Sequence, residues 1–342
     1  MAKPKGEDRV ARVTLQTIAE ATGLSKFAVS RSLSGKDGVS SETRELVTRV
    51  AAELGYLKPQ GQTRRGDIAI IFHDLDYVNS ELRMQEQNGI QEEARRLSYP
   101  VRLQWTHDPA RVAELARSSA GLLLVGPHDQ KTVDEAVAAG VPIVRMGWVS
   151  PLEEIDQVSG TDHEAGQAVG NYLMELGHKV IAFVHGTPGY RGRMERYYGL
   201  REVTETHPEV NVHQMSFEES SGFGPALRAL HADGIKPTAF FCAHDGLAVT
   251  VISELLTMGR RIPEEVSVVG FGDFAAARQI SPPLTTVRQH GTELGAVALR
   301  LLIDRINEGN GPRRLARRVQ VPSRLIERKS AGPAPRPGRR KG

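Results

Sequence analysis

The strongest constraint on the fold is an alternation of short apolar runs with amphipathic segments, from residue 67 to about residue 328. The runs have the length of strands and read DIAIIFHD, VRLQW, GLLLVGP, VPIVRMG, KVIAFVHG, PTAFFCAHD and VSVVGFG. A helical pattern through Ile90 to Leu97 follows the first run. Apolar strands separated by amphipathic helices are typical of parallel sheets that helices cover on both faces. We therefore expect an α/β fold.

An internal similarity divides this α/β part in two. DIAIIFH at 67–73 and KVIAFVH at 179–185 each begin a similar series of strands and helices. The sequence predicts two doubly wound parallel-sheet subdomains with a cleft between them. In such folds ligands bind at the carboxyl ends of the strands.

The first sixty residues have a helical pattern instead. Three short helices are expected between Val13 and Leu57, and Gly23 separates the first from the second, which Ser25 caps. Their apolar faces are expected to contain Leu15, Ile18, Ala19 and Thr22, then Ala28, Val29 and Leu33, then Leu46, Val47, Val50, Ala51 and Leu54. The third helix opens at Ser40 or Ser41. This order predicts an all-α helix-turn-helix headpiece.

A helix-turn-helix places the first residues of its second helix in the major groove of DNA. Lys26 could donate to guanine, Phe27 could contact a thymine methyl group, and Ala28 lies beside them. Arg31 lies one turn further, near bases or backbone. The candidates for phosphate contacts are Thr14, Ser25 and Ser30. The alternative is a small helical module with no role in DNA binding.

Charge is distributed unevenly along the chain. Residues 1–66 hold 12 Lys or Arg against 7 Asp or Glu, and residues 312–342 hold 11 against 1. Because the whole chain carries +3, the residues between these ends carry −12. Basic ends on an acidic body are expected when only the ends contact a polyanion. Residues 329–342 are predicted to be a basic disordered tail, whose alternative role is only to improve solubility.

Composition excludes several classes of protein. With 39% hydrophobic and 25% charged residues, the chain has the composition of a globular protein. It has no apolar stretch of roughly 18 residues and no secretory signal at its start, so we expect a cytoplasmic protein without a membrane partner. The single cysteine, Cys242, has no Cys or His partners at ligand spacing. We expect no disulfide, no metal and no cofactor.

Enzyme signatures are also missing from the sequence. It contains no G-x-x-x-x-G-K-[ST], H-E-x-x-H, G-x-S-x-G or G-x-G-x-x-G motif. The pairs His163-Glu164 and His244-Asp245 are adjacent, and adjacent residues on a helix do not face each other. We therefore expect that the protein is not an enzyme. An enzyme using the cleft and an exported sugar-binding protein are the rival classes; the first lacks a nucleophile or metal set and the second an export signal.

The block T-L-x-x-I-A-x-x-T-G-L-S-x-x-x-V-S-R-x-L, Thr14 to Leu33, resembles the headpiece of the LacI/GalR family of bacterial transcription regulators. The segments TDHEAGQAVGNYLMELGHKVIAFVHG, PTAFFCAHDGLAV and IPEEVSVVGFGDFAAARQISPPLTTVRQ resemble the regulatory core of that family. The resemblance implies a periplasmic-binding-protein-like core, a homodimer, a pseudo-palindromic DNA operator and a small carbohydrate-type effector in the cleft. It favours a repressor, while activation or dual regulation stays open.

The resemblance also implies domain boundaries. The expected parts are a disordered arm at 1–12, the headpiece at 13–58, a linker at 59–66, the core at 67–328 and the tail at 329–342. Within the core the N-subdomain is expected at about 67–158 and 291–307, and the C-subdomain at 159–288 and 308–328.

The linker departs from the family pattern. Family members usually have a hinge helix whose leucine enters the minor groove. This chain reads GYLKPQGQTRRGDIAI, with Gly61 and Gly66 in the linker and no leucine after Leu57. We expect no hinge helix, and a flexible linker whose Arg64 and Arg65 contact phosphates or a narrow minor groove.

The family's effector site carries over only in part. Arg196 matches the arginine that binds ligand oxygens, whereas His244-Asp245 replaces the usual Asn-Asp, and Gly272 before Asp273 replaces an acidic residue. The other candidates implied for the site are Leu82 and Arg83 in place of an aromatic pair, Trp148 as a stacking face, and Gln289 at the hinge.

With Arg83, Arg145, Arg196 and His244 as donors, an anionic effector such as a sugar phosphate or sugar acid fits better than a neutral sugar. Alternatively, Arg145 and His244 form structural hydrogen bonds at strand ends, and Trp148 is a packed wall residue.

Overall fold

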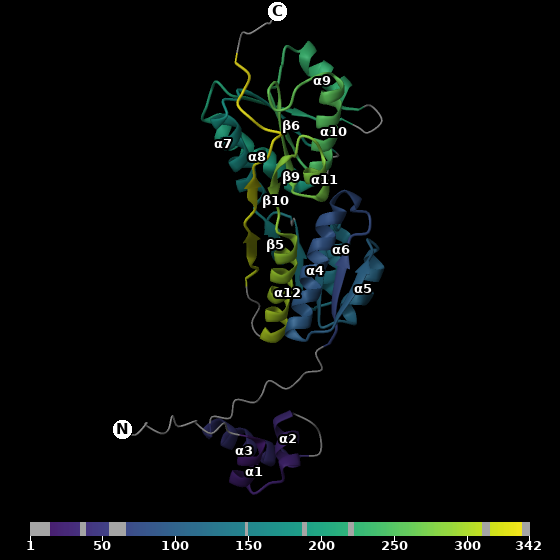
Figure 1. The fold of residues 1–342 in the computed structure, drawn as a ribbon. Helices are drawn as coiled ribbons and strands as arrows, with labels where there is room; N and C mark the ends of the chain where they lie inside the picture. The colour runs from purple at the N-terminus through teal and green to yellow at the C-terminus, as the bar shows by residue number, and fades with distance from the viewer. Residues whose placement is uncertain are drawn as a thin grey trace, which may run out of the picture. The chain divides into compact units, whose positions relative to one another are not determined.

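The computed structural model describes residues 14–34, 39–54, 66–147, 150–186, 190–217, 222–309 and 315–336. The chain divides into two compact units, residues 1–65 and residues 66–342. Figure 1 shows the helices of the first unit and the two α/β subdomains of the second. The predicted arm at 1–12 and most of the predicted linker, including Arg64 and Arg65, lie outside the described residues.

The headpiece contains the three predicted helices, α1 (Leu15–Thr22), α2 (Lys26–Ser34) and α3 (Ser41–Glu53). The Thr14 hydroxyl caps α1 by accepting the N–H of Thr17 at 3.3 Å, and Gly23 ends this helix with a left-handed φ of 68°. The Ser25 hydroxyl accepts the N–H of Ala28 at 3.1 Å at the start of α2. Short polar side chains and one glycine therefore set the helix boundaries.

A small apolar core holds these helices together. It consists of Ile18, Ala19, Val29, Val47 and Ala51, all of them buried. Full burial of a Val or Ile side chain stabilises a fold by roughly 1.5–3 kcal/mol. Leu54, predicted on the same face, follows the end of α3 and is 37% exposed, so it does not complete this core.

The second unit contains two six-stranded sheets. The first sheet has the order β11-β5-β4-β3-β1-β2 and the second has the order β12-β10-β9-β8-β6-β7. The strands of the first sheet are β1 (Ile68–Phe72), β2 (Val101–Trp105), β3 (Gly121–Val125), β4 (Ile143–Met146), β5 (Asp156–Gly160) and β11 (Arg318–Val321). Those of the second sheet are β6 (Val180–Val184), β7 (Asn211–Met215), β8 (Ala239–Cys242), β9 (Ser267–Gly272), β10 (Thr285–Arg288) and β12 (Arg324–Ile326). The described pairs are parallel except β10 with β12.

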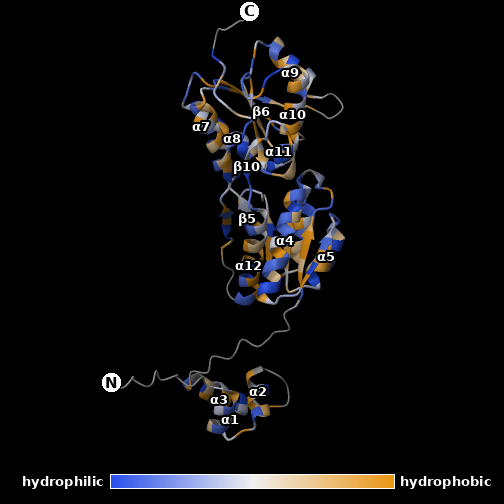
Figure 2. Ribbon diagram, viewed as in Figure 1, coloured by the Kyte–Doolittle hydropathy of each residue, from blue (hydrophilic) through white to orange (hydrophobic). Residues whose placement is uncertain are grey.

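Helices cover both faces of each sheet, as predicted. The N-subdomain helices are α4 (Ser80–Leu97), α5 (Pro109–Arg117), α6 (Gln130–Ala138) and α12 (Gly291–Glu308), with a 3-10 turn at Tyr77–Asn79. The C-subdomain helices are α7 (Asp162–Glu175), α8 (Arg191–Glu205), α9 (Phe223–Ala232), α10 (Asp245–Thr257) and α11 (Ala275–Gln279). Figure 2 shows apolar strands between helices of mixed polarity, which is the pattern expected for buried parallel sheets.

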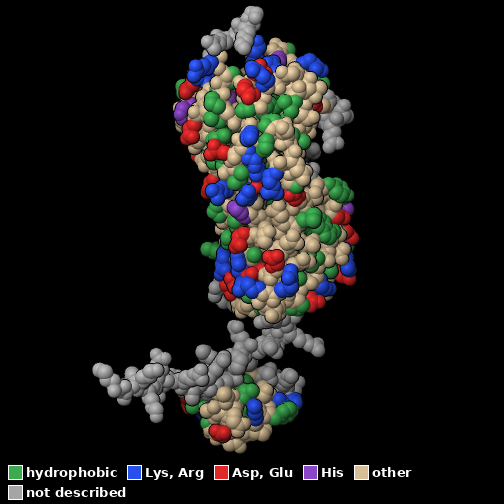
Figure 3. Space-filling view, in the orientation of Figure 1, with side chains coloured by type: hydrophobic (Ala, Val, Ile, Leu, Met, Phe, Trp, Pro, Cys, Tyr) green, Lys and Arg blue, Asp and Glu red, His purple; other side chains and the backbone are tan. Residues whose placement is uncertain are grey.

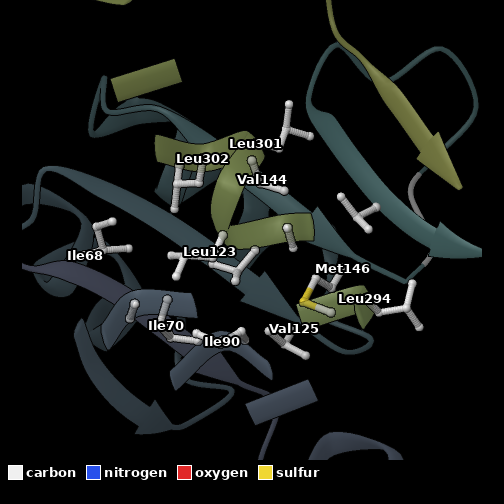
Figure 4. Close-up of a cluster of buried hydrophobic side chains, with 14 of the residues drawn as sticks. Ile68, Ile70, Ile90, Leu123, Val125, Val144, Met146, Leu294, Leu301 and Leu302 are labelled. Atoms are coloured by element: carbon white, nitrogen blue, oxygen red, sulfur yellow. The ribbon is translucent and has the colours of Figure 1, made fainter. Parts of the chain in front are cut away.

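Strand β1 illustrates how the two faces are filled. Ile68, Ile70 and Phe72 belong to one buried cluster with residues of α4 and α12, shown in Figure 4. Ala69 and Ile71 belong to another cluster, which contains residues of α5 and α6. Successive side chains of a strand point to opposite faces, so one uninterrupted apolar run serves both layers.

The chain crosses between the subdomains after β5, after β10 and after β11. The predicted boundaries need correction here. Residues 318–321 were expected in the C-subdomain, but β11 pairs in parallel with β5 in the first sheet. Strand β5 also extends to Gly160, beyond the expected boundary at residue 158. Backbone pairing decides these memberships, and neither strand has a long apolar run.

The start of the predicted disordered tail is ordered and packed. Ser330 and Ala331 are buried, and the Ser330 hydroxyl donates to the Val268 carbonyl at 2.6 Å and accepts from the Thr285 N–H at 2.8 Å. The Ala334 N–H donates to the Leu176 carbonyl at 2.7 Å. The expectation of disorder for 329–342 is therefore wrong for its first residues, whose side chains and backbone groups bond to the second sheet and to the end of α7. Residues 337–342 lie outside the described part.

Glycines allow two helix pairs to approach closely. A Cβ atom at Gly166 of α7 would lie 2.1 Å from the Arg196 carbonyl oxygen of α8, and one at Gly199 would lie 2.0 Å from the His163 carbonyl oxygen. In the N-subdomain, a Cβ atom at Gly295 of α12 would lie 2.1 Å from the Glu86 carbonyl oxygen of α4. No larger residue fits at these three positions unless the helices separate.

Replacing Gly166 by alanine should therefore separate α7 from α8. We expect Gly166→Ala to lower the free energy of unfolding by about 1–3 kcal/mol, because inserted atoms strain a packed interior. Urea titration monitored by circular dichroism measures the change. The control is Asn171→Ala on the exposed side of α7, which should alter stability by less than about 0.5 kcal/mol. Equal effects of the two substitutions would contradict the close-contact argument.

Among the described residues, no helix combines the length and the hydrophobicity that crossing a lipid bilayer requires.

Candidate DNA-binding and effector sites

The first turns of α2 present an exposed face. Ser25, Lys26, Phe27 and Ser30 are exposed, while Val29 is buried against the headpiece core. The Phe27 ring is 70% exposed, and the guanidinium group of Arg31 lies 5.5 Å from its centre. A large apolar side chain beside two cations suits contact with both a base and its phosphate. Ala28 is half-buried beside them.

A second candidate site is a cavity of about 140 Å³ between the two subdomains. Four of the predicted effector residues line it, namely Leu82, Arg83, Arg196 and Gln289. Other polar residues that line it were not predicted from the sequence: Asn79, Glu86, Ser159, Asp162, Tyr190, Arg191 and Arg193. Helical spacing could have indicated some of them, because Glu86 follows Arg83 by three residues and Arg193 precedes Arg196 by three.

The N-subdomain wall contains a buried ionic group. Arg83 Nε donates to Asp76 at 2.9 Å and Nη1 donates to Glu86 at 2.6 Å. Burial raises the pKa of Glu86, although the charge of Arg83 opposes this effect. Burial also acts against the charge of Arg83, but Glu86 and Asp76 outweigh it and raise the pKa of that guanidinium group. Two carboxylates already hold Arg83, contrary to its expected role as an anion donor.

The C-subdomain wall is built by the beginning of α8. Arg196 Nε donates to Asp162 at 2.8 Å, Nη1 donates to the Ala243 carbonyl, and the guanidinium group lies 3.4 Å from the centre of the Phe271 ring. Burial lowers the pKa of Arg196, and Asp162 partly restores it. The prediction that Arg196 faces the cleft agrees with this geometry. Its effector contact stays a prediction.

Three expected donors or acceptors do not line this cavity. Arg145 pairs with Glu153 at 2.8 Å, and Asp273 pairs with Arg288 at 2.7 Å and Arg328 at 2.5 Å. His244 Nδ1 caps α10 by accepting the N–H of Leu247 at 3.3 Å. The structural alternative for Arg145 and His244 therefore describes them better. Trp148 lies outside the described residues.

At Gly272, where the family usually has an acidic residue, the Phe274 ring fills the space next to the backbone. Gly272 has a φ of +132°, and a Cβ atom there would lie 2.5 Å from the Phe274 ring. Asp245, fully buried, accepts from the Thr286 hydroxyl at 2.6 Å and from the Phe274 N–H at 2.8 Å. Phe274 thus occupies space that an aspartate at Gly272 would need.

His244 should make stability depend on pH. Burial first, and then the charges of Arg193 and Arg196, lower its pKa to about 3. The unfolded chain binds this proton near pH 6.5, so stability falls as pH drops below 6.5 and continues to fall down to about pH 3. At pH 5 the loss from this group is on the order of 2 kcal/mol relative to pH 8.

The variant His244→Asn keeps a capping side chain and removes the titration. Urea unfolding at pH 8 and pH 5 should show a smaller pH dependence for this variant than for the wild type. The exposed-site control His207→Asn should retain the wild-type dependence. An unchanged dependence in His244→Asn would contradict a neutral, buried imidazole.

Comparisons with known proteins agree with this arrangement. The profile of bacterial regulatory proteins of the lacI family matches residues 14–59, and that of the periplasmic binding protein-like domain matches residues 171–331. The transcriptional regulator CelR of Thermobifida fusca is 30% identical over 322 residues, which cover 87% of this chain and 93% of CelR. The chain belongs to the LacI family. It is a DNA-binding transcription regulator, as the resemblance of its sequence implied.

Other relatives within the LacI family match almost the whole chain. The transcriptional repressor PurR of Pasteurella multocida is 27% identical, covering 93% of this chain and 98% of PurR. The solved CelR–cellobiose complex has a TM-score of 0.67 at 27% identity, covering 93% of this chain and all of that chain. A lac repressor dimer bound to operator and the anti-inducer ONPF shares the fold, with a TM-score of 0.66 at 23% identity over 94% of this chain and all of that one.

The named relatives are regulators of transcription. Within the described ranges, no three His, Cys, Asp or Glu side chains come together as a set of metal ligands.

Proposed function

We propose that this protein is a transcription repressor that binds a pseudo-palindromic operator as a homodimer and responds to a small carbohydrate-type effector. The observation that carries this proposal is the first turn of α2, where the side chains of Lys26 and Phe27 are exposed to solvent and are not part of the headpiece core. A two-fold dimer presents two such turns, which matches a pseudo-palindromic site. PurR is named a repressor, and the solved lac repressor is a dimer on its operator.

The cavity supports a polar effector of limited size. Asn79, Glu86, Asp162 and Arg196 line it and offer both hydrogen-bond donors and acceptors, which suits hydroxyl groups. Its volume of about 140 Å³ is close to that of an engineered protein cavity, of roughly 150 Å³, that binds benzene. We infer an effector with a single ring in this arrangement of the subdomains.

A contact across the cleft suggests how effector binding reaches the rest of the core. Glu81 of α4 accepts the N–H of Ala275 of α11 at 3.0 Å, so the two subdomains are tied directly. A ligand that favours one separation of the subdomains shifts the population of closed molecules. The coupling between effector and operator is typically about 1–3 kcal/mol.

The first test concerns the headpiece. Lys26→Ala and Phe27→Ala should each weaken operator binding by about 1–3 kcal/mol, because each removes a base contact. Fluorescence anisotropy with the operator, selected from genomic fragments, measures the loss. The control Thr48→Ala alters an exposed side chain of α3 and should bind like the wild type. Wild-type affinity in a folded Lys26→Ala protein would refute the assignment of the recognition face.

The second test concerns the cavity. A thermal-shift screen of carbohydrates should find a ligand that raises the melting temperature and also changes operator affinity. Arg196→Lys should remove both responses, because lysine lacks the planar fork that binds Asp162 and a ligand together. Operator affinity without ligand should stay within about threefold of the wild type. A full ligand response in Arg196→Lys would place the effector elsewhere.

We also infer that the cleft binds its ligand without converting it. The family relatives are regulators, and the lining residues form arginine–carboxylate pairs rather than a nucleophile with its base. Recovery of unchanged ligand after prolonged incubation with the protein tests this inference.

A further inference from the structure

The beginning of α8 brings several cations to one wall of the cavity. Arg191, Arg193 and Arg196 lie within its first six residues, and all three line the cavity. Arg193 and Arg196 are three residues apart and therefore share a face of the helix. They are only 4% and 9% exposed. The positive end of the helix dipole adds to the charge of this wall.

On the opposite wall, negatively charged side chains outnumber positively charged ones. There Arg83 is held between two carboxylates, Asp76 and Glu86, and Glu86 itself lines the cavity. On the α8 side, Asp162 is the carboxylate that lines the cavity among the described residues, and it pairs with Arg196. The cavity thus has arginines on its α8 wall and a carboxylate, Glu86, on the opposite wall.

Arg193 is buried and feels the charge of a second cation, Arg196. Its Nη1 donates to the His185 carbonyl at 3.4 Å, and its guanidinium group lies 4.2 Å from the centre of the Tyr190 ring. Burial and the neighbouring charge of Arg196 lower its pKa to about 10, despite opposing effects of Tyr190 and Asp76. A negative charge in the cavity would reduce the repulsion between the two guanidinium groups, whereas a neutral ligand would not.

A buried amide lies at the same cavity. Gln289 is 8% exposed and lines the cavity beside Gly160. Its amide nitrogen would be 3.1 Å from a Cβ atom at Gly160. Its side chain can donate to a ligand oxygen and accept from a ligand hydroxyl.

We propose that the effector carries an anionic group, a carboxylate or a phosphate, that binds Arg193 and Arg196, while its hydroxyl groups face Glu86. This inference rests on the proposed function, which makes the cavity the effector site. The effector is still anionic, as the sequence predicted. Its negative group now contacts Arg193 beside Arg196, in place of Arg83, Arg145 and His244. Two guanidinium forks on one helix face suit the oxygens of a carboxylate or phosphate.

The test begins with inorganic phosphate as a probe. Melting curves of the full chain are recorded in phosphate and in chloride at equal ionic strength, for the wild type, Arg193→Gln and Arg95→Gln. Arg95 is an exposed arginine of α4 outside the cavity, so the two variants lose the same charge. Phosphate should raise the melting temperature of the wild type and Arg95→Gln, and should raise that of Arg193→Gln by less than half as much.

Two results would overturn the proposal at this stage. One is an equal phosphate shift in all three proteins, and the other is the absence of any shift in the wild type relative to chloride. If Arg193→Gln does not fold, Arg193→Lys replaces it. Because lysine keeps the charge but lacks the fork, this variant should show an intermediate shift, and an undiminished shift would count against the proposal.

A matched series of ligands then distinguishes the sources of the charge. A hexose, its hexuronic acid and its 6-phosphate are compared by calorimetry with the wild type and Arg193→Gln. We expect the uronic acid or the phosphate to bind at least tenfold more tightly than the hexose, and the preference to disappear in Arg193→Gln. Tighter binding of the neutral hexose would overturn the anionic assignment.

Operator binding separates this inference from the proposed function. If a neutral sugar alone changes operator affinity, the regulator stands and the anionic inference fails. If anions bind through Arg193 but the protein prefers no operator fragment over bulk DNA, the anion site is supported and the repressor proposal is refuted.

Discussion

The close packing of two helix pairs positions residues on both walls of the cavity between the subdomains. Gly295 of α12 lies against the backbone of Glu86, and Gly166 of α7 lies against the backbone of Arg196. Each contact therefore fixes the backbone of a cavity residue on one of the two opposing walls. A methyl group at either glycine would meet a carbonyl oxygen near 2.1 Å, so the distance between helices has little tolerance. Charged groups can be buried here because rigid helices hold their partners in place.

Burial then decides which charges remain available to a ligand. The sequence predicted Arg83 and Arg145 as donors in the cleft, yet each of them forms an ion pair with a carboxylate. His244 stands where the family usually has asparagine, and in this chain burial keeps its imidazole neutral while it caps α10. The α8 wall differs because two arginines share one helix face, and Asp162, which also lines the cavity, pairs with one of them, Arg196. Figure 3 shows further Lys and Arg side chains gathered near the junction of the subdomains on the visible face.

Where the sequence departs from the family pattern, neighbouring side chains adjust to the change. Where the family usually has an acidic residue, Gly272 leaves room for the Phe274 ring. Asp245 accepts hydrogen bonds from the Phe274 N–H and the Thr286 hydroxyl, so it stabilises that loop. A pocket that loses one acceptor in this way has to select its ligand through other groups. Among the described residues, these include side chains of α4 and α8 together with Asn79, Asp162 and Gln289.

The helix-turn-helix and the helical layers on both faces of each sheet could be predicted from the sequence alone. Thr14, Gly23 and Ser25 act through local capping, and the run from Ile68 to Phe72 is apolar on both faces, so neighbours in sequence carry that information. Three features could be found only from the folded structure: the sheet to which β11 belongs, the packing of residues 329–336, and the partners of Arg83, Arg145 and Asp273. These depend on contacts between segments far apart in the chain. The free energy of a buried charge or an edge strand depends on which partner arrives there, and residue spacing does not encode that partner.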